Sequence, residues 1–344
     1  MNLGEHDGAP QSATLRGRKG WLITDGKAGM VVQVRGVADA LGLDYELKTV
    51  SLRGLGKIMA PWGKVSRDRN FTGAGAQLRP PWPEIAIATG RASIPYLRTL
   101  RLMAGPTCFT VVLQDPKSGR DTADLIWVPE HDRRRDVNVI TSLTSPHSFS
   151  AERLEALRAE LPSDIAALPG PRVAVVLGGK NAAYKYQESD DARFERALKR
   201  LAATGASFMV TTSRRTHQRL LHAVERATAD SARIVWTGEG DNPYPNFLAH
   251  ADFVIVTADS VNMTGEACAT GRPVWVFAPS GGSSKFRRFH EALMAHGATR
   301  ELDDRVVSLE AWSYAPLHSA QTIADEIEAR WLRRQEDLSG MMSQ

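Results

Sequence analysis

The sequence predicts an α/β protein of two doubly wound parallel sheets that face each other across a cleft. Three observations support this prediction. Short β-branched runs alternate with helical patterns along most of the 344 residues. The alternation stops near residues 144–171 and then begins again, and a chain of this length is typical of two domains. Apolar residues make up 42% and charged residues 24% of the chain, as in globular proteins.

The first half contains five predicted strands, each followed by a polar or glycine-containing turn. They span residues 20–24, 45–50, 83–89, 107–113 and 125–129. Helical patterns follow the first strand and the third. Residues 51–80 show no clear periodicity and predict a long loop or lid. We assign residues 19–165 to an N-terminal domain and predict a disordered lead-in at residues 1–18.

The second half repeats this plan after a predicted hinge at Leu168-Pro-Gly-Pro171. Predicted strands span residues 172–177, 207–212, 233–236, 252–257 and 273–278. Predicted helices span residues 190–204, 216–227, 260–270 and 286–296. We assign residues 166–315 to a C-terminal domain. A last helical pattern predicts that the segment 316–344 crosses back to the first domain.

Composition and charge exclude several classes of protein. The formal net charge is +4, without the dense basic and aromatic patches of nucleic-acid-binding proteins. No apolar run approaches the ~20 residues that cross a bilayer, and the N-terminus lacks the apolar core of a signal peptide. Cys108 and Cys268 lie far apart in apolar runs, which indicates a reducing compartment. We predict a cytoplasmic protein that does not bind nucleic acid.

Two short arginine runs leave peripheral contact with a membrane open. Arg133–Arg135 and Arg287–Arg288 are most often solvated faces, and less often contacts for anionic lipid. If these arginines do contact a membrane, we predict peripheral binding to the inner membrane surface, because that is the anionic surface that a cytoplasmic protein meets.

Residues suited to binding an anion follow the predicted strands of the first half. The turn Asp25–Gly29 joins a strand to a helix, where small residues and free N–H groups can hold an anion, although a plain tight turn explains it equally well. Because the carboxyl ends of parallel strands meet at one sheet edge, these turns are expected to line one wall of the cleft. The predicted anion-binding residues are Gly26, Lys27, Gly29, Gly90 and Arg91.

Three residues of the same edge compete for the role of a general base. Asp115 follows a strand that reads as buried, His131 precedes Asp132 in a candidate base pair, and Asp25 is the third choice. Each of them taken singly is more often structural than catalytic. The nine histidines show no metal-ligand spacing, so we predict no bound metal.

Two segments of the second half have the composition of a nucleotide site. Gly178–Asn181 places two glycines and a lysine at a strand end, which suits a diphosphate better than packing. Further on, Asp259 or Ser260 is expected to cap a helix, and Glu266 lies two turns in, where it can accept hydrogen bonds from a ribose diol or simply be solvated. The predicted nucleotide-binding residues are Gly178, Gly179, Lys180, Asn181, Ser260, Asn262, Met263 and Glu266.

These motifs resemble two known groups of proteins. The segment Glu266–Pro273 resembles the nucleotide-sugar half of GT-B glycosyltransferases, in particular those that add N-acetylglucosamine to lipid-linked peptidoglycan precursors. A longer pattern over residues 20–300 resembles the plant mitochondrial-fission adaptor family and its bacterial relatives. That pattern consists of Asp25-Gly-Lys-Ala-Gly29 with Gln33, Thr89-Gly-Arg91, Gln114-Asp-Pro116, Pro129-Glu-His-Asp132, Gly178-Gly-Lys-Asn181 and Asp259-Ser-Val-Asn262.

The resemblance implies two Rossmann-like domains of GT-B type and a nucleotide-sugar function. In the glycosyltransferases the residue that matches Glu266 holds the ribose, and the matching helix start holds the diphosphate. We therefore predict a transferase whose second domain binds a nucleotide diphosphate sugar, UDP-linked, and whose first domain binds a hydroxyl acceptor, free or membrane-attached. GT-B enzymes typically need no metal, so no cofactor is predicted and the nucleotide sugar is a substrate.

The competing prediction is a non-catalytic adaptor of the same fold that recruits a protein partner to a membrane, as the plant member recruits a dynamin-like GTPase. The glycine turns and Glu266 favour a working nucleotide site, whereas the lack of an obvious base favours the adaptor. Met30 stands where the family commonly has asparagine, which weakens a role for that side chain. An epimerase with a dinucleotide fingerprint and a Tyr-x-x-x-Lys pair is disfavoured, because Tyr184–Tyr186 lack that spacing.

Overall fold

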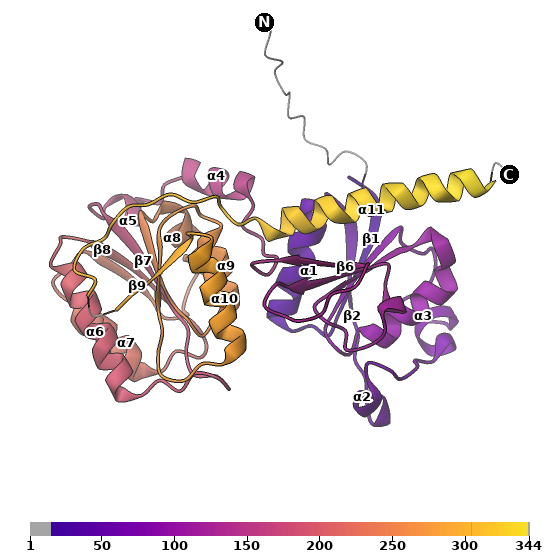
Figure 1. The fold of residues 1–344 in the computed structure, drawn as a ribbon, viewed down its shortest axis with the longest axis horizontal. Helices are drawn as coiled ribbons and strands as arrows, with labels where there is room; N and C mark the ends of the chain where they lie inside the picture. Colours follow the sequence, from indigo (N-terminus) through magenta and orange to yellow (C-terminus); the bar gives the residue numbers. More distant parts are fainter. Residues whose placement is uncertain (1–14, 304, 343–344) are drawn as a thin grey trace, which may run out of the picture.

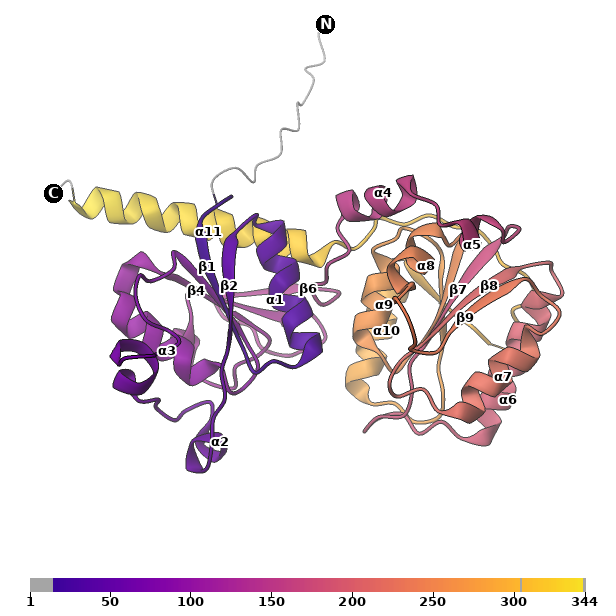
Figure 2. The same ribbon diagram turned by 180° about the vertical axis from the view of Figure 1, so that it is seen from behind.

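Two α/β domains lie side by side in the structure, a computed structural model described for residues 15–303 and 305–342 (Figure 1). The chain crosses between the domains twice, once before α4 and once before α11 (Figures 1 and 2). Most of the predicted lead-in at residues 1–18 lies outside the described residues. None of the described helices is long and apolar enough to cross a membrane.

The first domain is a six-stranded sheet in the order β2-β1-β3-β4-β5-β6, with every neighbouring pair parallel. Its strands are β1 Lys19–Thr24, β2 Asp44–Thr49, β3 Ile85–Thr89, β4 Phe109–Leu113, β5 Leu125–Pro129 and β6 Val139–Ser142. Its helices are α1 Ala28–Ala40, α2 Leu55–Met59 and α3 Ile94–Ala104, with single turns at η1 Asp68–Thr72, η2 Gly105–Thr107 and η3 Arg120–Thr122.

The second domain is also a six-stranded parallel sheet, in the order β12-β11-β10-β7-β8-β9. Its strands are β7 Arg172–Leu177, β8 Ser207–Thr212, β9 Arg233–Trp236, β10 Phe253–Thr257, β11 Val274–Phe277 and β12 Thr299–Glu301. The remaining helices are α4 Ala151–Ala159, α5 Ser163–Ala166, α6 Glu188–Ala202, α7 Gln218–Ala227, α8 Tyr244–His250, α9 Val261–Cys268, α10 Ser284–Ala295 and α11 Ser319–Met342.

Both sheets are doubly wound, as predicted. The strand order reverses between β1 and β3 in the first sheet and between β7 and β10 in the second. Crevices at such switch points, outside the carboxyl ends of the strands, are where open α/β sheets bind ligands. The four turns that the sequence singles out, after β1, β3, β7 and β10, therefore flank the two switch points.

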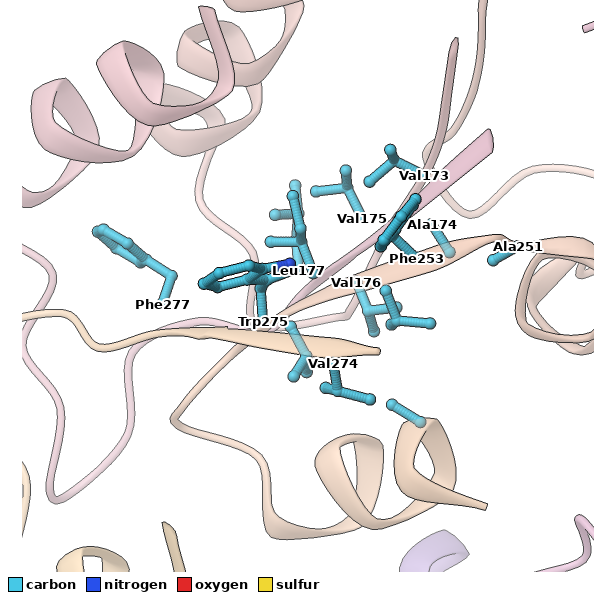
Figure 3. Close-up of a cluster of buried hydrophobic side chains, with 14 of the residues drawn as sticks. Val173, Ala174, Val175, Val176, Leu177, Ala251, Phe253, Val274, Trp275 and Phe277 are labelled. Carbon is cyan, nitrogen blue, oxygen red and sulfur yellow. The ribbon is translucent and has the colours of Figure 1, made fainter. Parts of the chain in front are cut away.

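The central strands are buried on both faces, which explains their uninterrupted apolar sequences. In the second domain, Val173–Leu177 of β7 belong to one buried cluster with Phe253 of the neighbouring strand β10 and with Trp275 and Phe277 of β11 (Figure 3). Residues 173–177 are each at most 2% exposed. This core fixes the carboxyl ends of β7 and β10 next to each other.

The last helix belongs to the core of the first domain although it follows the second in sequence. Ile323, Ile327 and Trp331 of α11 are buried in the cluster that includes Val34 and Val37 of α1. The two crossings meet where the Thr144 and Ser319 hydroxyl groups form a hydrogen bond of 2.5 Å. Helix α11 runs from Ser319 to Met342, within the segment 316–344 that was predicted to cross back.

Several short elements were not predicted from the sequence. Strands β6 and β12, at sheet edges, and helices α5 and α8 span three to seven residues each, too few for a periodic pattern. The segment 51–80, predicted as a loop or lid, contains α2 and the π-helical turn η1.

Acid should destabilise the protein through His147, in the first crossing. Its Nδ1 accepts a hydrogen bond from the Phe149 N–H at 3.2 Å, and burial, with repulsion from His318, lowers its pKa to about 4. The unfolded chain, with a pKa near 6.5, then binds a proton that the folded chain excludes. Stability present above pH 6.5 should fall by about 2–3 kcal/mol toward pH 4 through this group. Urea unfolding of His147→Gln should show a correspondingly smaller pH dependence; an unchanged dependence would contradict this role.

Candidate functional site

Two strand-end turns of the first sheet lie against each other at its switch point. The Asp25 carboxylate, after β1, accepts hydrogen bonds from the Lys27 ammonium at 2.7 Å and from the Lys27 backbone N–H at 3.4 Å. Gly90, after β3, packs on this carboxylate, since a β-carbon there would lie 3.2 Å from Asp25 Cγ. Gly26 and Gly90 have φ angles of +80° and +87°, which favour glycine. Asp25, one of the predicted bases, is thus paired with a cation of its own turn.

Arg91 supports the segment that follows β2. Its Nε donates to the Ala60 carbonyl oxygen at 2.5 Å, and its Nη2 donates to that of Ile58 at 3.1 Å. Arg91 also lines a pocket of about 500 Å³ at the strand ends, together with Lys27 and Asp115. With Gly90, four of the predicted first-domain residues therefore share one pocket, although two of the Arg91 nitrogens are already bonded to backbone oxygens.

Asp115, after β4, is held as a carboxylate between two cations. Its oxygens accept hydrogen bonds from the Lys117 ammonium at 2.7 Å and from the Arg134 guanidinium at 3.0 Å. Partial burial opposes ionisation, but the hydrogen bonds from Lys117 and Arg134 outweigh it and lower the pKa of Asp115. A carboxylate with a lowered pKa accepts a proton less readily, which weakens the case for Asp115 as the base.

His131 lies at the boundary between the domains and is buried and neutral. Burial, with a smaller contribution from the Lys285 ammonium, lowers its pKa to about 4, and its Nδ1 has no partner among the described residues. The predicted His131–Asp132 pair does not form, because the Asp132 carboxylate binds Lys285 of α10 at 2.8 Å instead. The His131 carbonyl oxygen accepts hydrogen bonds from Arg288 at 3.0 and 3.2 Å. These contacts tie the two domains together beside the imidazole.

In the second domain, Asp259 organises the turn after β7. Its side chain is fully buried and accepts hydrogen bonds from the Gly179 N–H at 2.9 Å and the Thr257 hydroxyl at 2.8 Å. The Tyr186 hydroxyl donates to the same carboxylate, and the Arg215 guanidinium pairs with it at 2.9 Å. The sequence singled out Asp259 only as a helix cap, a role that falls to Ser260. The available signal was an acidic residue two positions after the end of an apolar strand.

The glycine pair at positions 178 and 179 is required by packing. A β-carbon at Gly178 would lie 2.2 Å from an Asp259 oxygen, and one at Gly179 would lie 1.9 Å from the Arg215 carbonyl oxygen. Their N–H groups donate to Thr257 and Asp259. The reason inferred from the sequence, close approach of a diphosphate, is therefore not needed to explain the two glycines, and their role in ligand binding stays a prediction.

The next two residues differ in how they are engaged. The Asn181 amide oxygen accepts from the Ala183 and Tyr184 N–H groups, each at 2.8 Å, and its nitrogen donates to the Asp259 carbonyl oxygen at 3.0 Å. Asn181 thus shapes the turn. Lys180 is exposed, and no acidic side chain of the described chain lies within ion-pair distance of it. Of the two, Lys180 is the one free to meet an anion.

Helix α9 presents the other predicted donor residues. Ser260 caps it by accepting from the Met263 N–H at 3.3 Å, which leaves the amides of Val261 and Asn262 as the remaining first-turn donors. Glu266 accepts a hydrogen bond from the buried Tyr244 hydroxyl at 2.6 Å. Burial raises the pKa of the Glu266 carboxyl to about 7, although the Tyr244 hydrogen bond opposes this. A role for Tyr244 was not predicted, because the residues around it, Asn242, Pro243 and Pro245, indicate only a turn.

A cavity of about 540 Å³ lies between the domains. It is lined by the turn after β1, the end of β5, the first turn of α9 and the start of α10. Gly29 and Asn262, far apart in sequence, face each other there, because a β-carbon at Gly29 would lie 3.5 Å from Asn262 Nδ2. His131 lines this cavity, which shares Lys27, Met30 and Gln114 with the strand-end pocket. The other predicted donor residues do not line either of these two pockets.

This architecture defines a class of protein. Two doubly wound domains with their switch-point turns beside one interdomain cavity form a GT-B-like fold, and solved structures share it. A putative UDP-N-acetylglucosamine 2-epimerase from Listeria monocytogenes aligns with a TM-score of 0.53 at 10% identity, over 93% of this chain and 97% of that one. The UDP-GlcNAc 2-epimerase from Neisseria meningitidis bound to UDP-GlcNAc aligns with 0.50 at 9% identity, over 92% and 100%. At such identities these likenesses show the fold alone.

The chain belongs to the mitochondrial fission ELM1 family, whose model matches residues 28–331. It is 28% identical over 269 residues to mitochondrial fission protein ELM1 of Arabidopsis thaliana, covering 71% of this chain and 63% of that protein. It is 32% identical over 160 residues to uncharacterized protein RP120 of Rickettsia prowazekii, 45% of each chain. The matches thus span less than two thirds of either relative. The predicted family and fold are confirmed.

Proposed function

We propose that this protein binds a nucleotide diphosphate sugar, UDP-linked, on its second domain and transfers the sugar to a hydroxyl acceptor held by the first. The observation that supports this most is the interdomain cavity, where the glycine turn after β1 faces the first turn of α9. Ligands of doubly wound sheets bind at such switch points. The Neisseria neighbour, by name bound to UDP-GlcNAc, has the same two-domain fold.

The charges of the second domain suit a diphosphate. The Lys180 ammonium and the first-turn amides of α9 follow β7 and β10, which are neighbours in the sheet. A helix N-terminus and an unpaired ammonium both favour the negative charge that develops on a diphosphate leaving group. On the same helix, one carboxyl oxygen of Glu266 accepts a hydrogen bond from the Tyr244 hydroxyl, and the other oxygen can accept one from a ribose hydroxyl.

Glu266→Ala should weaken UDP binding by about 1–3 kcal/mol, because it removes the hydrogen bonds to the ribose. Isothermal titration of the full chain with UDP and UDP-GlcNAc measures this change. The matched control is Glu310→Ala, a surface glutamate of the second domain whose ion pair with Arg300 is exposed. Equal affinities for the wild type and a folded Glu266→Ala would remove Glu266 from the site.

The same titration tests the predicted independence of metal. No group of three or more potential ligand side chains gathers within the described part of the chain. EDTA is expected to leave the binding curve unchanged. Abolition of binding by EDTA, with recovery on addition of magnesium or manganese, would contradict the prediction.

A non-catalytic adaptor is the second candidate, consistent with the family. The observation that favours it is the missing His131–Asp132 pair, which leaves the imidazole without a carboxylate to orient it. Titration and turnover together separate the two candidates. An adaptor that has lost the site should not bind UDP sugars, and one that has kept the site should bind them without transfer. Turnover assays should also score epimerisation of the donor, since both neighbours described above are named 2-epimerases.

A further inference from the structure

The segment between β2 and β3 exposes an apolar helical face that nothing in the described chain covers. Leu55, Ile58 and Met59 follow the i, i+3, i+4 spacing of one helix face, and Trp62 lies three residues beyond the end of that helix at Met59. Such a face normally packs on a core, yet these side chains are 76%, 72%, 57% and 62% exposed, and no residue of α2 is buried. Helix α2 projects from the first domain on the side opposite α11 (Figures 1 and 2).

This segment is held in place by the domain behind it. The Arg91 guanidinium donates to the carbonyl oxygens of Ile58 and Ala60, at 3.1 and 2.5 Å, and Arg98 donates to that of Trp62 at 3.4 Å. These bonds occupy backbone oxygens at the end of the helix and leave its side chains outward. The exposure of the apolar face is therefore built into the fold.

Cations without an ion-pair partner in the described chain flank the apolar residues in sequence. The exposed residues Arg53, Lys57, Lys64, Arg67 and Arg69 have no ion-pair partner among the described residues, and Asp68 is the one acidic residue between positions 51 and 79. Arg53, Lys64 and Arg69 also line a pocket of about 460 Å³ beside α2 whose lining contains no acidic residue. A pocket of that charge fits a phosphate group.

The two arginine runs singled out from the sequence are engaged differently. Arg134 pairs with Asp115, and Arg135 donates to three backbone carbonyl oxygens. Arg288 bonds to the His131 carbonyl oxygen, and Arg287 lies 3.8 Å from Glu291. Arg133 is exposed and without an ion-pair partner in the described chain, as are the cations near α2. The cations near α2 differ in lying next to the exposed apolar side chains of that helix in sequence.

We propose that residues 53–69, the docking finger, bind the surface of an anionic bilayer. The apolar face of α2 and Trp62 enters the interface, where an aromatic ring is favoured, and the surrounding cations bind lipid phosphates. The combination of an outward apolar face with a rim of unpaired cations is complementary to a headgroup layer over acyl chains. The finger is short, so this binding is peripheral.

Docking in this way has a consequence for the strand-end pocket. Pro61 and Trp62 line that pocket together with Lys27, Arg91 and Asp115. The finger therefore brings the candidate acceptor side of the cleft next to the bilayer. The proposal does not rest on sugar transfer, because the finger is defined by its own exposure and charge.

Flotation of the full chain with lipid vesicles tests the finger. The wild type is expected to bind vesicles of phosphatidylcholine with about a third phosphatidylglycerol, and to bind phosphatidylcholine alone much less. Leu55→Ser with Ile58→Ser should lower partitioning at least about tenfold. Lys64→Gln with Arg69→Gln should lower it about fivefold for each charge removed, and added salt should have the same effect.

Matched controls distinguish an effect of the docking finger from a general effect of removing exposed apolar or charged side chains. Leu102→Ser removes an equally exposed apolar side chain elsewhere on the first domain, and Lys185→Gln with Arg214→Gln removes two exposed cations of the second domain. Both controls should bind vesicles as the wild type does. Brominated lipid should quench the wild type more than Trp62→Phe, which reports insertion of that ring directly.

Two outcomes would overturn the proposal. One is a wild-type chain that does not bind anionic vesicles, in which case the apolar face belongs to a protein contact. The other is full vesicle binding by the finger variants while their circular dichroism matches that of the wild type. Neither outcome bears on nucleotide affinity, so the proposed function is tested separately by titration.

Discussion

Replacement of Asp259 by alanine is expected to lower the free energy of unfolding of the second domain by about 3–5 kcal/mol. The Asp259 carboxylate is fully buried and satisfies the Gly179 N–H, the Tyr186 hydroxyl and the Arg215 guanidinium. Its removal leaves these donors without an acceptor, and the buried part of the Arg215 charge without a partner. Breaking a buried pair on one side is costly for this reason.

Urea unfolding at pH 7, followed by tryptophan fluorescence, measures the loss. Glu310→Ala serves as the control, since its ion pair with Arg300 is exposed and should contribute less than about 1 kcal/mol. Asp259→Asn keeps the shape but not the charge, so its effect should lie between the two. A loss for Asp259→Ala no larger than that for Glu310→Ala would show that Asp259 does not organise the turn.

In a transfer assay, His131→Gln is expected to lower kcat by about 10²–10⁴-fold while donor affinity is retained, as for loss of a general base. The imidazole lines the interdomain cavity, and its Nδ1 has no partner among the described residues. Its lowered pKa keeps it unprotonated at neutral pH but also makes it a weaker base, so the case for His131 rests on its place in the cavity. Asp115 is the weaker candidate, because Lys117 and Arg134 hold its carboxylate. The sequence ranked the two equally.

Asp115→Asn is the matched comparison, with an expected loss in kcat below about tenfold. A larger loss for Asp115→Asn than for His131→Gln would move the role of the base to Asp115. If the wild type binds the donor but neither the wild type nor any variant transfers sugar, a non-catalytic adaptor becomes the better hypothesis for the function of this protein.

Much of the fold could be predicted because its signals are local. The strands of both switch points are continuous apolar runs, and β1, β3 and β7 are followed within two residues by glycine, which indicates a strand–turn–helix unit. The edge strands β6 and β12 could not be predicted in this way. They are three or four residues long and incompletely buried, so pairing with a neighbour, and not their own sequence, makes them strands.

The residues of the candidate site likewise fall into those that local sequence signals predict and those that tertiary contacts bring in. Lys27, Gly29 and His131 were predicted from their positions after strands, and Asn262 from its place on a helix and in the family pattern; the structure brings the four to one cavity. The partners of Asp259 and Glu266 were not predicted, because Arg215 and Tyr244 reach them from other loops of the sheet edge. Such pairings depend on strand order and register, which residue types do not reveal.

The sequence by itself determined the two-sheet architecture, the strand-end turns and the family, because each depends on contiguous residues. Only the tertiary structure decided what those turns do: that the glycines at 178 and 179 make room for Asp259 and Arg215, and that Asp132 binds Lys285 rather than His131. It also decided that residues 55–59 form a helix with outward apolar side chains, in a segment where the sequence shows no clear periodicity. A side chain's environment is set by elements distant in sequence, so burial, charge pairing and exposure follow only from how those elements pack.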